Sequence, residues 1–201
     1  AKTDIGARIL VHQAMQSVDL EPTAGKSLQS VLHMANVLRV GFGLPYAAMT
    51  ATLAGVQKTR AGIVASFWGD GGLVCRGVDG VWSLLRLEFD GLPRYPVTSS
   101  LQTCRADWVR GDVESPWPMS AGYPYWLQLD TARYNAAAVV SDGFFSFLKD
   151  GQPVDVTDQL LDVRGLRGKW CQRHLRGVLK ELASQGIHPM DDISMAGIAI
   201  R

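Results

Sequence analysis

The strongest concentration of side chains that could do chemistry is a set of cations near the C-terminal end. Residues 164–201 carry seven Lys and Arg but only three Asp and Glu, although the 201-residue chain has a net charge of only +1. The cations expected to contact DNA here are Arg164, Arg167, Lys169, Arg173, Arg176 and Lys180. The last three recur at three- and four-residue spacing, which places them on one face of a helix over residues 166–185. Such a face can bind phosphates by displacing condensed counterions. A solvated helix face and an acidic protein partner are the alternatives.

A second, smaller polar group follows a predicted turn near residue 55. Ala51 and Gly55 are four residues apart, as a helix-turn-helix requires where its helices cross and turn, and Gly55 is expected to take a positive φ. The polar residues at the start of the second helix, all expected to contact DNA, are Gln57, Lys58, Thr59 and Arg60. In this interpretation Arg60 reaches guanine, Gln57 reaches adenine, and the other two hold phosphate. The alternative is a short polar surface patch.

A β-hairpin is predicted directly downstream of this pair of helices. Residues 73–75 and 81–85 form its strands, and the Asp-Gly pair in Gly77–Gly80 is a strong tight-turn signal. Trp82 is expected to be largely buried beneath the hairpin, and Arg76 is a further candidate for phosphate contact. Upstream, apolar residues spaced by three and four predict a helix over residues 26–40.

The order of helices and hairpin resembles the DNA-binding half of winged-helix regulators, most closely the IclR type. The matching residues are Lys26-Ser27-Leu28, Ala51 with Gly55, Lys58-Thr59-Arg60 and Gly72-Leu73-Val74. The resemblance covers about 60 residues and implies a recognition helix in the DNA major groove. Winged helices also serve as protein-interaction modules, so this second function stays open.

The second half of the chain has a weaker resemblance of the same kind. A strand over residues 125–130, a helix over 131–151, a short helix near 160, the basic helix and a terminal strand follow in order. This order resembles the C-terminal winged helix of plasmid replication initiators. The matching residues are Leu129, Arg133-Tyr134, Leu175 and Val178-Leu179-Lys180-Glu181-Leu182.

The composition is that of a globular protein, with 47% hydrophobic and 19% charged residues. We expect neither a membrane span nor a signal peptide, because charges interrupt every long apolar run. The cysteines, Cys75, Cys104 and Cys171, have no metal-binding spacing and are expected to be reduced thiols of a cytoplasmic protein. Scattered histidines and the absence of a GxSxG motif argue against an enzyme, and no cofactor or metal is expected.

The sequence therefore predicts an α+β, mainly helical fold with two winged-helix-like domains joined by a Pro-rich connector. Its parts are an amphipathic N-terminal helix (1–25), a winged helix-turn-helix (26–90), the connector (91–124) and a basic winged-helix-like domain (125–201). The expected partner is double-stranded DNA, with a homodimer left open. The predicted function is that of a transcriptional regulator or of a replication or partition factor of a mobile element. The alternative is an interaction module of a larger assembly.

Overall fold

The computed structural model describes residues 25–45, 52–60, 62–89, 104–110 and 125–200. In these ranges the helices are α2 (Gly25–Gly41), the 3-10 helix η2 (Asp142–Phe145), α3 (Thr157–Leu161) and α4 (Trp170–Ser184). The strands are β1 (Leu53–Thr59), β2 (Gly62–Trp68), β3 (Gly71–Gly77), β4 (Trp82–Phe89), β5 (Cys104–Arg110), β6 (Tyr125–Leu129), β7 (Tyr134–Val140), β8 (Phe147–Lys149), β9 (Gln152–Pro153), β10 (Ile187–Pro189) and β11 (Met195–Ala199). Strands outweigh helices in the described chain, so the prediction of a mainly helical fold is wrong.

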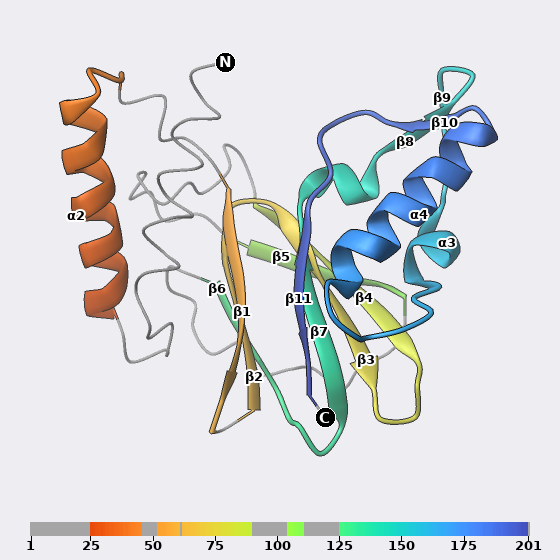
Figure 1. Ribbon diagram of the computed structural model, residues 1–201, viewed down its shortest axis with the longest axis horizontal. Helices are drawn as coiled ribbons and strands as arrows, with labels where there is room; N and C mark the ends of the chain where they lie inside the picture. The colour runs from red at the N-terminus through yellow and green to blue at the C-terminus, as the bar shows by residue number, and fades with distance from the viewer. Residues whose placement is uncertain (1–24, 46–51, 61, 90–103, 111–124, 201) are drawn as a thin grey trace.

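Two antiparallel sheets form the body of the molecule (Figure 1). The small sheet has the strand order β1-β2-β6, and the large sheet has the order β11-β7-β3-β4-β5. The chain passes from the small to the large sheet twice, between β2 and β3 and between β6 and β7. Both sheets therefore contain strands from residues 26–90 and from residues 125–201, and two separate winged-helix-like units do not describe them.

The large sheet is covered on both faces, because its side chains alternate between two cores. In β3 and β4, Leu73 and Leu85 pack toward the small sheet, whereas Val74 and Leu84 pack toward the helices. The core against the small sheet is built mainly from Ile63, Phe67, Leu73, Leu85, Leu87, Leu127, Leu129 and Val139. The core against the helices is built mainly from Val74, Leu84, Val140, Phe144, Phe147, Leu160, Trp170, Leu182 and Ile187. The result is three layers, with α3 and α4 on the outside of the large sheet (Figure 1).

The predicted helix-turn-helix is instead a β-hairpin. Gly55 lies in β1 opposite Ser66 of β2, and its φ is not positive. All seven residues of β2 are buried, because this strand is central in its sheet. A strand buried on both faces is a continuous apolar run, which periodicity alone does not distinguish from a buried helix. The β-branched and aromatic residues Ile63, Val64 and Phe67 were the available signal for a strand.

The predicted helix over residues 131–151 is also wrong, because this segment forms β7, η2 and β8. Alanines 136–138 favour a helix by intrinsic propensity. In the fold they are fully buried in a central strand between β3 and β11. Small side chains suit this position, where Ala138 lies close to the backbone of Gly197 in β11. Tertiary packing therefore overrides local propensity here.

The predicted hairpin over residues 73–85 is confirmed. β3 pairs with β4 so that Cys75 lies opposite Ser83, and Gly80 at the turn has a φ of 91°. Trp82 was expected to be largely buried beneath the hairpin but is only half-buried, although its ring packs against that of Trp170 in the helix layer, with 5.9 Å between centroids. Ser83 is 7% exposed and faces the other side of the strand, as alternation requires.

Several further elements agree with the sequence. α2, β6, α4 and β11 lie where a helix, a strand, the basic helix and a terminal strand were predicted, and Gly186 follows α4 with a φ of 74°. α3 is shorter than its prediction. The predicted N-terminal helix and most of the predicted connector lie outside the described residues. Within the connector, residues 104–110 form β5, the edge strand of the large sheet.

Candidate nucleic-acid interface

The predicted contact residues fall into two separate groups. Gln57, Lys58 and Thr59 lie in β1, and Arg60 is exposed at the β1–β2 turn, so none of the four lies on a recognition helix. This turn is at the bottom of Figure 1, whereas α4 lies to the upper right. Arg76 lies in β3 and donates from Nη1 to Oδ1 of Asn135 at 3.3 Å. The remaining six predicted residues belong to α4 and to the loop before it.

α4 is amphipathic, and this property sets which of its residues meet solvent. Trp170, Cys171 and Leu182 are buried against the large sheet. Arg176 and Lys180 are exposed on the opposite side. The predicted separation of an apolar and a basic face on this helix is confirmed.

The cations around α4 differ in whether they already have an ion-pair or hydrogen-bond partner. Arg164 forms an ion pair with Asp162, with 3.0 Å between Nη2 and Oδ2. Arg173 donates from Nη2 to the carbonyl oxygens of Gly165 at 3.4 Å and Arg167 at 3.1 Å, and so ties the preceding loop to the helix. Four cations have no acidic partner within the described residues, and these are Arg167, Lys169, Arg176 and Lys180.

A shallow hollow of about 380 Å³ runs along the outer side of α4. We call it the basic depression, and its lining residues are Lys169, Gln172, Arg173, Arg176, Gly177 and Lys180. It contains four cations and no carboxylate. Because like charges repel, an anionic group is the natural occupant of such a surface.

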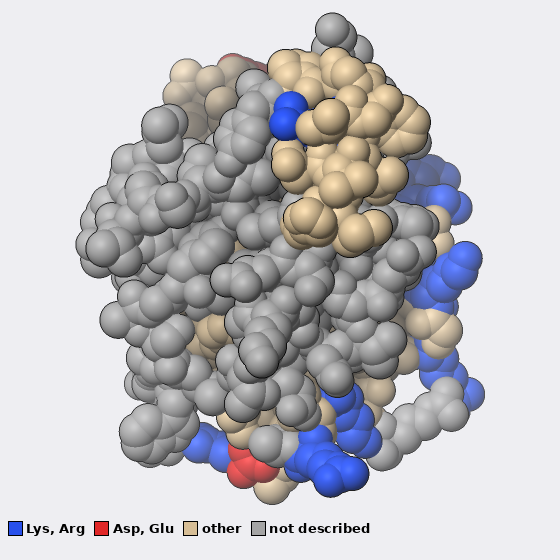
Figure 2. Space-filling model, turned by 90° about the vertical axis from the view of Figure 1, so that its left-hand side faces the viewer, with Lys and Arg blue, Asp and Glu red and all other residues tan. Residues whose placement is uncertain are grey.

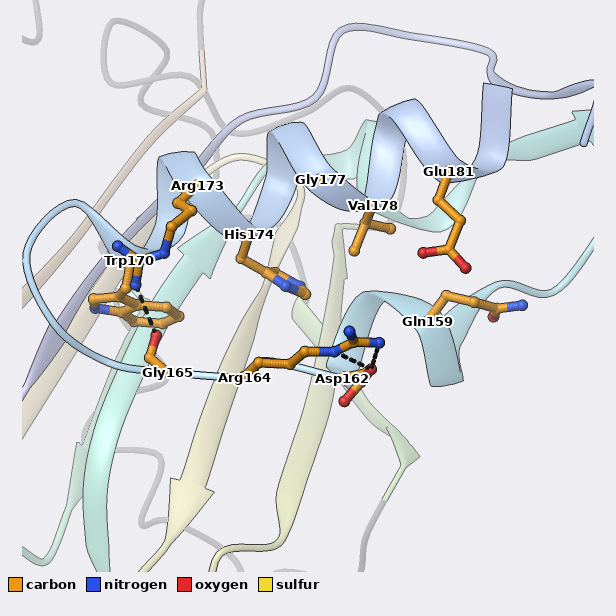
Figure 3. A pocket seen from close by; sticks show the side chains of 10 residues that line it. All are labelled: Gln159, Asp162, Arg164, Gly165, Trp170, Arg173, His174, Gly177, Val178 and Glu181. Atoms are coloured by element: carbon orange, nitrogen blue, oxygen red, sulfur yellow. Dashed lines mark hydrogen bonds and ion pairs between the residues drawn. The ribbon is translucent and has the colours of Figure 1, made fainter. Parts of the chain in front are cut away.

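A second hollow, of about 400 Å³, lies between α3 and α4 (Figure 3). We call it the α3–α4 cleft, and its lining residues are Gln159, Asp162, Arg164, Gly165, Trp170, Arg173, His174, Gly177, Val178 and Glu181. Figure 3 shows the His174 ring pointing from α4 toward α3, with Glu181 and Gln159 opposite each other. The Nε2 atom of His174 lies 2.7 Å from the carbonyl oxygen of Leu160, which fixes the ring. In contrast to the basic depression, the cleft contains both acidic and basic side chains.

The short helix α3 is held in place from both sides. On its inner side, its own residues Leu160 and Leu161 are buried. On its outer side, Arg110 of β5 forms an ion pair with Asp158. Asp155 accepts a hydrogen bond from the backbone N–H of Thr157 at 2.9 Å. Hydrogen bonds from Thr157 lower the pKa of the Asp155 carboxyl, because they stabilise its charged form. α3 is therefore a fixed wall of the cleft.

The two buried thiols of the described structure are suited to packing rather than to reaction. Cys75 and Cys171 are free and buried. Burial raises the pKa of Cys75 from 9.0 to about 12 and that of Cys171 to about 11. Both are therefore protonated near neutral pH, and the nucleophilic thiolate is suppressed. The described residues contain no group of three or more His, Cys, Asp and Glu that could hold a metal ion.

Figure 2 shows how charge is distributed on the face that carries α2. Lys and Arg side chains follow the right-hand edge of this face, with no Asp or Glu among them.

The described part of the chain has no helix of the length and apolarity that crossing a bilayer demands.

Of the residues that line the cleft, only Arg164 and Arg173 were predicted as contact residues from the sequence. His174, Gly177 and Glu181 follow one face of α4 at three- and four-residue spacing, which is a visible helix signal. Gln159 and Asp162 come from α3 and the loop after it, and no sequence pattern joins them to α4. Only the packing of α3 against α4 brings the two sets together.

The chain matches no protein-family model, no curated protein and no solved structure. The resemblances to IclR-type regulators and to plasmid replication initiators therefore find neither support nor contradiction among known proteins.

Proposed function

We propose that the protein binds DNA through the outer face of α4, with Arg167, Lys169, Arg176 and Lys180 contacting backbone phosphates. The observation that supports this most is that these four cations are exposed and have no acidic partner in the described structure, and that Lys169, Arg176 and Lys180 line the basic depression. Lys169 and Lys180 are eleven residues apart, and at 1.5 Å per residue this is about 16 Å, enough to span several phosphates.

The proposed contact is to phosphates rather than to base edges of the major groove. α4 packs flat against the large sheet and has α3 beside it, so it does not project as an isolated recognition helix. Phosphate contacts hold a protein on DNA without reading sequence. The role as a regulator, or as a replication or partition factor, stays a prediction.

The test is duplex affinity across a series of salt concentrations. Arg176→Ala with Lys180→Ala should weaken binding to all sequences and flatten the dependence of log K on log salt by roughly two units, about 0.9 for each lost phosphate contact. Folding should change little, because exposed charges contribute little to stability.

The matched control is Lys58→Ala with Arg60→Ala, which removes the same charge at the β1–β2 turn. This control should bind like the parent. Weaker binding by the control alone would move the interface to the β1–β2 turn. No duplex binding by the parent at low salt would refute the proposal.

A second candidate function, a protein-interaction module, is favoured by one observation on α2. The exposed apolar side chains at this helix are Met34, Val37, Val40 and Phe42, with exposures of 46–67%. The partner consistent with the sequence is a second copy of the chain. Light scattering of the parent and of Val37→Lys tests it, and a parent that stays monomeric at high concentration rules out this dimer.

A further inference from the structure

The basic depression and the α3–α4 cleft meet at one position on α4. Gly177 and Arg173 line both hollows. On one side of Gly177 the charged residues of the lining are all cations, and on the other the lining includes the carboxylates of Asp162 and Glu181. The two hollows therefore offer different chemistry to one ligand that crosses α4.

Gly177 is the residue that keeps this crossing open. It lies in the interior of a 15-residue helix, where Gly is a poorer helix former than Ala. A Cβ at this position would meet no atom within 4 Å, so packing in the described structure does not require Gly. A side chain here would instead stand between the two hollows.

The cleft presents polar groups that are not yet used. Glu181 points from α4 toward α3, where Gln159 lies opposite it (Figure 3), and the side chain of neither has a hydrogen-bond partner among the described residues. His174 is fixed by its bond to Leu160 and forms part of the wall. The amide and carboxylate groups can exchange hydrogen bonds with amino and carbonyl groups on the edges of bases.

We propose that this joint site binds an unpaired nucleotide of a single strand, with its phosphate in the basic depression and its base in the α3–α4 cleft. The proposal rests on the proposed function and names the form of nucleic acid that suits the site. The carboxylates repel phosphate from the cleft but can accept hydrogen bonds from base amino groups. A base paired within a duplex is stacked and cannot enter a side cleft without leaving the helix.

The probes are a fluorescein-labelled 12-nucleotide DNA strand of mixed sequence and an abasic sugar-phosphate strand of the same length. Anisotropy titrations of the full chain at one salt concentration compare them. The parent should bind the strand with bases about tenfold more tightly than the abasic strand, in keeping with what a good pair of hydrogen bonds to a base edge contributes.

Two variants test whether the base enters the cleft across position 177. Gly177→Leu should reduce the ratio of the two affinities to near one, because its side chain blocks the crossing. Gly41→Leu, at the end of α2, is the matched control, since a Cβ there also meets nothing within 4 Å. This control should keep the parental ratio. Glu181→Gln with Gln159→Ala should also reduce the ratio.

The outcomes separate this inference from the proposed function. Equal affinities of the parent for both strands, or an unchanged ratio in Gly177→Leu, would overturn the inference and leave phosphate binding in place. Absence of binding to either strand and to duplex would overturn both. Competition by poly-glutamate as effective as that by the strand with bases would also overturn the inference and favour an acidic protein partner.

Discussion

The two faces of the large sheet differ in what covers them. Toward the small sheet, side chains such as Phe67, Leu73 and Leu87 are fully buried in a closed apolar core. Toward the helices, a second apolar core lies beneath α4, but the outer side of that helix has cations and two hollows. Stability and binding should therefore respond to different substitutions. Substitutions between the sheets should act on folding, and substitutions on the outer side of α4 should act on binding.

The largest expected effect is the loss of a ring between the sheets. Phe67 is 0% exposed, and Phe67→Ala should lower the free energy of unfolding by about 3–5 kcal/mol. Urea unfolding measures this loss, with Val81→Ala as the control, because Val81 is 58% exposed. A loss similar to that of the control would mean that the two sheets are not packed as described.

A backbone substitution at the junction of the sheets should have the next largest effect. Gly62 has a φ of 138°, and a Cβ there would meet the carbonyl oxygen of Leu129 in β6. Gly62→Ala should therefore lower the free energy of unfolding by about 2 kcal/mol, from strain in the left-handed region together with the contact. Thermal melting checks this, and an unchanged melting temperature would contradict the β2–β6 pairing at this end.

The buried thiol between the sheets should make stability depend on alkaline pH. The pKa of Cys75 is about 12 in the fold against an ordinary value of 9.0, so the unfolded chain loses its proton first. Stability is fully present below pH 9 and falls as pH rises above it, by about 1.4 kcal/mol at pH 10, the highest pH of the proposed series. Urea unfolding at several pH values should show a smaller alkaline loss for Cys75→Ala than for the parent. Equal losses in both proteins would show that Cys75 is not shielded from solvent.

The smallest expected effect has the opposite sign and lies on the helix side. Gly177→Ala should raise the free energy of unfolding by up to about 1 kcal/mol, because Ala is the better helix former and its Cβ has open space. Gly62→Ala and Gly177→Ala are thus the same substitution, but one should lower and the other raise the free energy of unfolding. A destabilised Gly177→Ala variant would show that this position is packed, and would weaken the argument that Gly177 is kept for a ligand.

Some elements of the fold could be predicted from the sequence, and others could not. The hairpin over residues 73–85 was predictable, because an Asp-Gly turn and flanking apolar residues act locally. The same holds for α4, whose apolar and basic faces follow a helical period and whose end has Gly186. The hairpin of β1 and β2 was not predictable, because β2 is buried on both faces. It therefore lacks the alternation of apolar and polar residues that marks a half-exposed strand.

The candidate site divides in the same way. The cations of α4 could be found from the sequence, because one helix carries them at regular spacing. The cleft could not, because Gln159 and Asp162 are brought beside His174 and Glu181 only when α3 packs against α4. The prediction of a recognition helix near Lys58 was wrong for a related reason. The spacing of these residues suits a helix, but β1 pairs with β2 as a strand.

Local signals in the chain were enough to specify α2, the hairpin of β3 and β4, and the amphipathic α4. Long-range packing was needed to make β2 and β7 strands, to bring residues from both halves of the chain into the two sheets, and to form a cleft beside α4. The two sets differ in the sequence distance over which the responsible interactions act. Helical periodicity and turn chemistry act between residues a few positions apart, whereas central strands and clefts are defined by partners that the chain brings from far away.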